Sequence, residues 1–110
     1  MTGQIVNLSD GRNTYQFALH SIGQAYRAVS GLYAFVGLAL NGNWDVHYVG
    51  ESSNLDNRIG SGLIVHHRIE CAKRRGATHI LSMAFTGSDD QRRQIEANLR
   101  AYYNPPCNRQ

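Results

Sequence analysis

The chain of 110 residues predicts an α/β protein of the α+β type, with a small, mainly antiparallel sheet and helices against its faces. Apolar segments of strand length fill most of the first half, and two of them flank the hairpin signal Asn41-Gly42. Two amphipathic segments and another apolar run follow in the second half. A chain of this length supports one hydrophobic core, so we expect a single domain.

Two strands are expected before residue 30. A short edge strand is predicted around residues 5–8. Residues 14–22 place Tyr15, Phe17 and Leu19 at alternate positions, which is typical of a half-buried strand.

A hairpin is predicted at the centre of the chain, after a short helical link over residues 24–29. Residues 31–40 form an apolar run, and residues 44–50 return with apolar side chains at alternate positions. Asn41 and Gly42 both tolerate the positive φ that a tight primed turn requires. We therefore expect two paired strands joined by such a turn.

Helical signals begin directly after this hairpin. Residues 52–54 can cap a helix that starts at Leu55 and carries Arg58 and Ile59. Residues 60–62, Gly-Ser-Gly, are expected to interrupt or end it.

A second helix and a further strand are predicted next. Residues 65–75 carry apolar residues on one side and basic residues on the other. Gly76 is placed to end this helix in the left-handed conformation. Residues 78–86 are β-rich and apolar enough to form a well-covered strand.

The last helix begins at a capping-box pattern, Ser88 followed by Gln91, and is expected to run to about Tyr103, before two prolines. Glu96 falls at the margin of the apolar stripe, where a carboxylate is partly desolvated and needs a cation or a donor. The predicted stripe consists of Ile95, Leu99, Tyr102 and Tyr103.

The charge balance is mildly basic, with a formal net charge of +3, and favours an anionic partner. Most cations lie in the second half, where solvated helix faces and a phosphate-facing surface are almost equally good interpretations. No apolar stretch has the length of about 20 residues that spans a bilayer, so no membrane association is expected. These basic residues are Arg68, Lys73, Arg74, Arg75, Arg92, Arg93, Arg100 and Arg109.

Cys71 and Cys107 are too few for a disulfide framework, and we interpret them as reduced thiols of a cytoplasmic protein. The N-terminus also lacks the pattern of a signal peptide. His67 and Cys71 have a spacing that could share a zinc ion with Cys107, but such spacings are usually structural.

Four polar residues are not explained by the core alone. Tyr33 and Tyr48 are most simply half-buried strand aromatics, Arg58 a surface arginine, and Glu96 a boundary glutamate paired with Arg58 or Arg100. Together, however, two tyrosines, an arginine and a carboxylate can bind and activate a phosphodiester.

The joint pattern resembles the GIY-YIG nuclease superfamily. Gly-Leu-Tyr at 31–33 and Tyr-Val-Gly at 48–50 correspond to its paired signature, and Arg58 lies ten residues after the second tyrosine, as in that family. Glu96 is followed twelve residues later by Asn108 in a proline-containing tail, as in the branch used for excision-repair incision. The resemblance covers residues 31–108. It divides the chain into an N-terminal extension, residues 1–29, and a stand-alone nuclease-like domain, residues 30–110.

The chain departs from the family pattern at two positions. Glu51 stands where some members carry a lysine, and Gly62 where others carry a histidine. His66 fills the second role if the segment before it adds about one turn of chain. The proton acceptor is therefore the least defined part of the predicted site.

The resemblance implies metal-dependent hydrolysis of nucleic-acid phosphodiesters, with DNA favoured over RNA. Glu96 would ligate one Mg²⁺ or Mn²⁺, and Arg58 would neutralise charge on the phosphoryl oxygens. Tyr33 or Tyr48, aided by His66, would orient or deprotonate the attacking water, provided that a neighbouring cation lowers the pKa of the tyrosine.

The resemblance also implies that Asn108 hydrogen-bonds Tyr33 or the phosphate. Sequence choice would have to come from a homodimer or from a partner. The alternative is a nucleic-acid-binding module on the same scaffold without catalysis, and a third, weaker one is a small protein-interaction domain.

Overall fold

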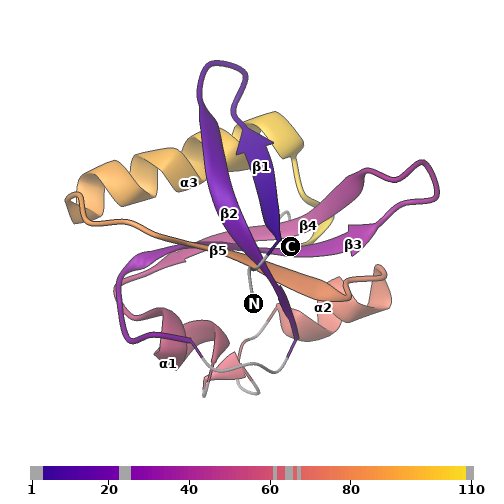
Figure 1. The fold of residues 1–110 in the computed structure, drawn as a ribbon, viewed down its shortest axis with the longest axis horizontal. Coiled ribbons are helices and arrows are strands. Elements are labelled where there is room, and N and C mark those ends of the chain that lie inside the picture. Colours follow the sequence, from indigo (N-terminus) through magenta and orange to yellow (C-terminus); the bar gives the residue numbers. More distant parts are fainter. Residues whose placement is uncertain (1–3, 23–25, 61, 64–65, 67, 109–110) are drawn as a thin grey trace.

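A computed structural model of the protein describes residues 4–22, 26–60, 62–63, 66 and 68–108. Five strands form one antiparallel sheet with the order β1-β2-β5-β3-β4, so the predicted α+β fold class is confirmed (Figure 1). The strands are β1 (Ile5–Ser9), β2 (Thr14–Ser21), β3 (Gly31–Leu38), β4 (Trp44–Ser52) and β5 (His79–Ala84). The helices are α1 (Leu55–Ile59), α2 (Ile69–Arg74) and α3 (Asp89–Tyr103), followed by the 3₁₀ turn η2 (Pro106–Asn108).

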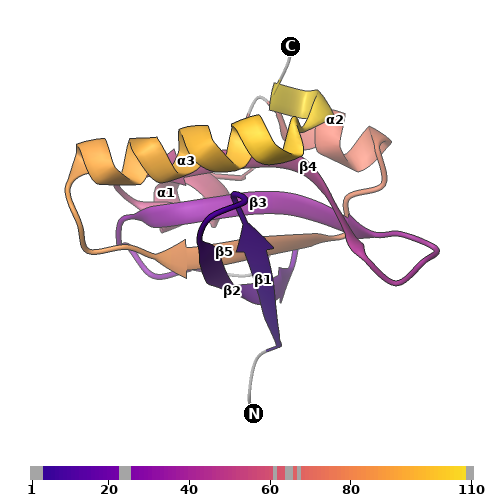
Figure 2. The ribbon, with the colours of Figure 1, turned by 90° about the horizontal axis from the view of Figure 1, so that it is seen from above.

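Helices cover both faces of the sheet. In Figures 1 and 2, α3 lies against one face, while α1 and α2 lie on the other. β3 supplies both cores, because successive side chains of a strand point to opposite faces. Tyr33 and Phe35 join the cluster on the α1–α2 side, and Leu32 and Ala34 join the cluster that contains Leu99 of α3.

The two predicted N-terminal strands are confirmed as β1 and β2. β2 pairs with β5, so both strands extend the sheet that contains the central hairpin. The predicted helical link over residues 24–29 falls partly on residues outside the described ranges. Its described part, residues 26–29, is not helical.

The hairpin between β3 and β4 is confirmed, but the expected primed turn is wrong. Gly42 has a φ of 87°, whereas Asn41 is not among the described residues with positive φ. Gly42 donates to the Ala39 carbonyl at 3.0 Å, and Ala39 donates to the Asn43 carbonyl at 2.8 Å. The loop is therefore a turn closed by one left-handed glycine, which needs positive φ at a single position.

The signals at the ends of the first two helices are largely confirmed. The Asn54 side chain accepts the Asn57 N–H and caps α1, which ends before Gly60. α2 begins at Ile69, later than expected, and residues 64–65 lie outside the described part. Gly76 is left-handed as predicted, with a φ of 99°. No helix in the described part of the chain is both long enough and apolar enough to cross a membrane.

The last helix has the predicted ends but a different buried stripe. Ser88 and Gln91 form the capping box, and α3 ends at Tyr103. Tyr102 was expected on the stripe but is 56% exposed. Arg92 is buried instead, because it lies one turn before Glu96 and two turns before Leu99 on the face that packs against the sheet.

The expectation of two reduced thiols is also wrong, because Cys71 and Cys107 form a disulfide between α2 and η2. Bonded to each other, the two sulfurs are not available as thiolate ligands, which excludes the zinc set that was the less favoured interpretation of their spacing. Its third member, His67, lies outside the described residues. The disulfide instead attaches the C-terminal turn to the α1–α2 side of the sheet.

Candidate functional site

Tyr33 is the buried centre of the candidate site, with 1% of its surface exposed. It lies opposite Gly50 in the register of β3 and β4. A Cβ atom at position 50 would collide with the ring and the hydroxyl of Tyr33. The glycine of the second motif therefore lets the Tyr33 ring lie across β4, one of the two edge strands of the sheet.

Position 31, in the first motif, also has no room for a side chain. A Cβ at Gly31 would collide with the Met83 carbonyl of β5 and lie 2.9 Å from the Leu55 Cδ1 of α1. Gly31 thus allows β5 and α1 to approach β3 closely. Because α1 is held in this position, its last turn brings Arg58 to the Tyr33 hydroxyl.

Two side chains meet the Tyr33 hydroxyl. The Nε of Arg58 donates to it at 3.3 Å, and the Nε2 of His66 lies 2.7 Å away. The Nδ1 of His66 accepts the Arg68 N–H at 3.1 Å. From this bond we assign the proton of a neutral His66 ring to Nε2, which then donates to Tyr33. With two donors on its oxygen, the Tyr33 hydroxyl directs its own proton elsewhere.

Tyr48 completes this group on the α1–α2 side of the sheet. Its ring stacks on Phe35 with a centroid separation of 5.5 Å and meets the edge of His66 at 5.3 Å. The Tyr33 and Tyr48 rings are 6.1 Å apart. Four of the six predicted site residues, Tyr33, Tyr48, Arg58 and His66, thus lie together although 33 positions separate the first from the last.

The electrostatics of this group keep Tyr33 neutral. Burial raises the pKa of the Tyr33 phenol well above its ordinary value, Tyr48 adds to the rise, and Arg58 offsets it only in part. Burial alone would lower the pKa of Arg58, but attraction to the Tyr33 and Tyr48 oxygens outweighs it, and the net shift is upward. The expectation that a neighbouring cation lowers the pKa of the tyrosine is therefore wrong for Tyr33.

Glu96 lies on α3, on the opposite face of the sheet from the Tyr33 group. It is half-buried, and its Oε1 is 3.7 Å from the Nη1 of Arg100. Burial raises the pKa of the Glu96 carboxyl, the nearby charge of Glu51 adds to the rise, and Arg100 partly offsets it. Glu96 is therefore a poorly solvated carboxylate beside β4, with one loosely held cation.

The donor set fits Mg²⁺ or Mn²⁺ in one respect. Among the residues that the structure describes, no three His, Cys, Asp or Glu side chains gather as a metal cluster. Mg²⁺ does not need one, because it is commonly bound by one or two carboxylates, waters and substrate phosphates. Glu51 is already held by Arg92 at 2.6 Å, whereas Glu96 is 3.7 Å from Arg100, so of these two carboxylates Glu96 is the more loosely held.

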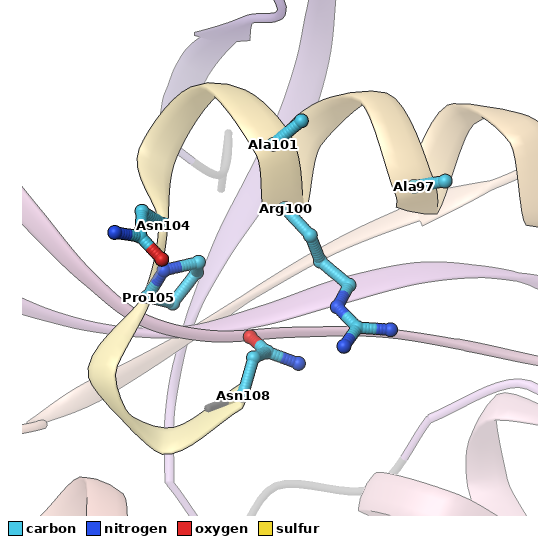
Figure 3. A pocket seen from close by; sticks show the side chains of 6 residues that line it. All are labelled: Ala97, Arg100, Ala101, Asn104, Pro105 and Asn108. Carbon is cyan, nitrogen blue, oxygen red and sulfur yellow. The ribbon is translucent and has the colours of Figure 1, made fainter. Parts of the chain in front are cut away.

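Asn108 does not hydrogen-bond Tyr33, which corrects one of its two expected roles. Its side-chain amide pairs with both backbone groups of Val49 on β4. Asn108 and Arg100 line a hollow of about 260 Å³, which also includes Ala97 and Pro105. In Figure 3 the Arg100 side chain extends from α3 toward Asn108, so the partner of Glu96 and the C-terminal asparagine share this hollow.

One ion-pair group next to the site was not predicted. Arg92, 3% exposed, contacts Glu51 at 2.6 Å and Asp89 at 2.9 Å. The helical spacing of Arg92 from Glu96 and Leu99 is the signal that could have placed it on the buried face. It fixes Glu51, the residue after the second motif, on the α3 side of β4.

Comparisons with family models, with curated proteins and with solved structures found no match to this chain. The resemblance to the GIY-YIG superfamily therefore rests on the motif residues of the sequence, and membership of that family stays a prediction.

Proposed function

We propose that this protein is a metal-dependent endonuclease of the GIY-YIG type, which hydrolyses phosphodiester bonds of nucleic acids, with DNA favoured over RNA. The convergence of Arg58 and His66 on the Tyr33 hydroxyl is the observation that carries the proposal. This convergence joins three positions of the motif pattern that are far apart in the sequence. Packing of the core alone does not require an arginine and a histidine at one buried phenol.

Arg58 is the proposed phosphate ligand. It stays cationic, and its guanidinium has five N–H donors, so a phosphate can receive two of them while Nε remains on Tyr33. A preorganised cation of this kind stabilises charge that develops on the phosphoryl oxygens. The exposed residues Lys73, Arg74 and Arg75 of α2 and its C-terminal end add positive charge on the same side of the sheet.

Tyr33 acts as a positioning donor rather than as a base. Since its oxygen receives Arg58 and His66, its proton would have to turn from Tyr48, its hydrogen-bonding neighbour, to be donated to a phosphoryl oxygen or to the attacking water. A phenol with a raised pKa keeps that proton at neutral pH. Of the two roles expected for the tyrosine, orienting or deprotonating the water, this keeps the first for Tyr33.

Glu96 would hold the divalent cation on the α3 side of the edge strand β4, so a phosphate would have to lie at this edge to contact both the ion and Arg58. When bound, Mg²⁺ or Mn²⁺ supplies a Lewis acid that polarises the scissile phosphate and stabilises the leaving oxygen. The half-buried carboxylate of Glu96 gains from a cation because burial disfavours its charge. Arg100 has to move away from Glu96 for this, and a contact of 3.7 Å is loose enough to break.

A plasmid-nicking assay with Mg²⁺ and with EDTA tests the proposal. Glu96→Gln should abolish nicking, and Tyr33→Phe and Arg58→Lys should each slow it by about 100-fold or more. Glu70→Gln, which alters an exposed glutamate of α2, is the matched control and should leave the rate unchanged. Nicking by Glu96→Gln at the wild-type rate, or nicking that survives EDTA, contradicts the proposal.

The second candidate is a nucleic-acid-binding module without catalysis. It is favoured by the resting arrangement, in which Arg100 pairs with Glu96, and Glu96 lies on the opposite face of the sheet from the Tyr33 group. Such a module would bind DNA in EDTA with an affinity that falls steeply with salt, and would cut nothing when Mg²⁺ or Mn²⁺ is added.

A further inference from the structure

A second hollow of about 290 Å³ lies on the α1–α2 side of the sheet, beside α1 and apart from the Tyr33 group. β2 and β5 form its floor, and the segment that leads into β3 forms a wall. Its lining includes Ala18, His20, Tyr26, Arg27, Leu55 and Ser82. We call it the Tyr26 hollow. Small side chains on the two strands leave this space open.

Two hydroxyl groups in the Tyr26 hollow, those of Tyr26 and Ser82, can form further hydrogen bonds. The Tyr26 hydroxyl is buried, and among the described residues it has no hydrogen-bond partner. Buried polar groups without a partner are rare in folded proteins, so this one indicates a missing partner. His20 Nε2 lies 2.9 Å from the Ser82 hydroxyl, which retains further hydrogen-bonding capacity. The Tyr26 ring meets the edge of His20 at 4.9 Å.

The Tyr26 hollow lies close to the candidate site on the same face of the sheet. Ser82 is directly opposite Tyr33 on one side and opposite Ala18 on the other. Two strand spacings, about 10 Å, therefore separate the backbones of Tyr33 and Ala18. Leu55 of α1 lines the hollow, and Arg58, one turn later, contacts Tyr33. Neighbouring phosphates in one strand of nucleic acid are closer together than this separation. One strand can therefore have a phosphate at Tyr33 and reach the Tyr26 hollow with an adjacent nucleotide.

We propose that the Tyr26 hollow binds one unstacked nucleobase of the strand whose scissile phosphate lies at Tyr33 and Arg58. This rests on the proposed nuclease function. The apolar lining and the Tyr26 ring suit a flat aromatic base, and the Tyr26 and Ser82 hydroxyls can each accept from or donate to its edge. Arg27, exposed at the rim, suits the phosphate that follows.

The proposal has a physical reason in the shape of the site. Tyr33 is buried under Gly50 and α1, so a phosphate can reach its hydroxyl more easily if the flanking nucleotide leaves the base stack. Enzymes that do chemistry on a base hold the extruded nucleotide in a pocket with hydrogen bonds to its edge and stacking on side chains, and such a pocket can equally hold a base next to a scissile phosphate. The Tyr26 hollow supplies both elements beside the hydroxyl.

Affinity for single-stranded oligonucleotides in EDTA tests this, because without metal no strand is cut. The probes are one intact strand of mixed sequence and a series in which one position at a time is abasic. For the wild type, one abasic position should weaken binding by about 5-fold to 100-fold, as loss of one stacked base does. Tyr26→Phe should reduce this discrimination, and Ala18→Met, which fills the hollow, should abolish it. Tyr15→Phe, on β2 but outside the hollow, should leave it intact.

Equal affinity of the wild type for intact and abasic strands overturns the inference, as does unchanged discrimination by Ala18→Met that is folded by circular dichroism. Absence of binding to any strand also overturns it. The outcome is distinct from that of the nicking assay. A protein that nicks but ignores the abasic position lacks the base pocket, whereas one that senses the base and never nicks lacks the proposed catalysis.

Discussion

Asn108 hydrogen-bonds both backbone groups of Val49: its Oδ1 accepts the Val49 N–H at 2.8 Å, and its Nδ2 donates to the Val49 carbonyl at 2.9 Å. β4 is an edge strand, so these are bonds that a further strand would otherwise make. Open strand edges attract other chains, and native proteins commonly cover them. The side chain of Asn108 therefore covers the edge of the sheet beside Tyr48 and Gly50.

Replacing Asn108 by alanine should reduce the free energy of unfolding by about 1–2 kcal/mol, because two hydrogen bonds of ordinary strength are lost. Urea denaturation measures this. Asn98→Ala, which removes an acceptor for Gln94 on the surface of α3, is the control and should cost less than about 0.5 kcal/mol. Equal stability of Asn108→Ala and the wild type would show that water replaces both bonds without loss.

The ionised Glu96 side chain should lower the free energy of unfolding at neutral pH. Burial raises its pKa above the ordinary value of 4.5, so the folded protein binds the proton more readily than the unfolded chain. The stability linked to this proton is present below that ordinary value and is lost as pH rises through the raised folded pKa. Glu96→Gln should therefore be at least as stable as the wild type at neutral pH, and should lose this advantage at about pH 4.

Urea midpoints of the two proteins across this pH range measure the effect, with Glu70→Gln as an exposed control. The loss of the exposed Arg100 contact should matter little, since such pairs contribute about 0–1 kcal/mol. A Glu96→Gln protein that is clearly less stable at neutral pH would mean that Arg100 compensates fully for burial, which leaves Glu96 a structural residue.

The features that the sequence predicted well depend on residues a few positions apart. Strand alternation, the Asn54 cap, the Ser88 capping box and left-handed Gly76 each need only local geometry. The turn type failed within the same range, because a loop with one left-handed residue and a loop with two can both use Asn-Gly. Strand order was not predicted, since β5 enters between β2 and β3 only through tertiary pairing.

For the candidate site, the predicted hairpin and the helix after it placed Tyr33 near Arg58, whereas His66 joined them only through the family resemblance. Hydrophobic periodicity gives the face of a strand or helix, but not which distant polar atoms meet on it. The partner of Asn108 was missed because backbone N–H and carbonyl groups occur at every residue and leave no signal in the sequence. The disulfide was missed because two cysteines do not make a disulfide framework, and because a separation of 36 residues leaves no local signal that the two sulfurs meet.

Arg92→Met should destabilise the fold by about 3 kcal/mol, because Glu51 would keep its charge beside β4 without its main partner. Arg92 is 3% exposed and contacts Glu51 at 2.6 Å. Arg93→Met changes the next residue of the same helix, which is exposed, and should cost less than about 0.5 kcal/mol. Similar losses for the two variants in urea denaturation would contradict a structural role for the buried pair.

Alkaline conditions should unfold the protein with a contribution from Tyr33. Burial raises its pKa, so the unfolded chain releases this proton first, above about pH 10. Stability is then full below the unfolded pKa and falls as pH rises, by up to about 1.4 kcal/mol per pH unit for each such tyrosine. Tyr33→Phe should lose stability less steeply than the wild type in this range. Tyr102→Phe, at an exposed position, should follow the wild type, and identical slopes for all three would contradict the assignment.

The disulfide should be coupled to the Asn108 contact. Cys71 and Cys107 are 36 residues apart, and closing a loop of this length stabilises a fold by about 3–4 kcal/mol in the chain-entropy account. Reduction with dithiothreitol should therefore lower the urea midpoint strongly.

Asn108 follows Cys107 directly, so once η2 is released from α2 the Asn108–Val49 pair has to hold the C-terminal turn unaided. Asn108→Ala should then cost less in the reduced protein than in the oxidised one. An equal loss of unfolding free energy in the reduced and oxidised proteins would mean that the Asn108–Val49 hydrogen bonds form independently of the disulfide. The C-terminal turn would then cover the edge of β4 without help from the disulfide.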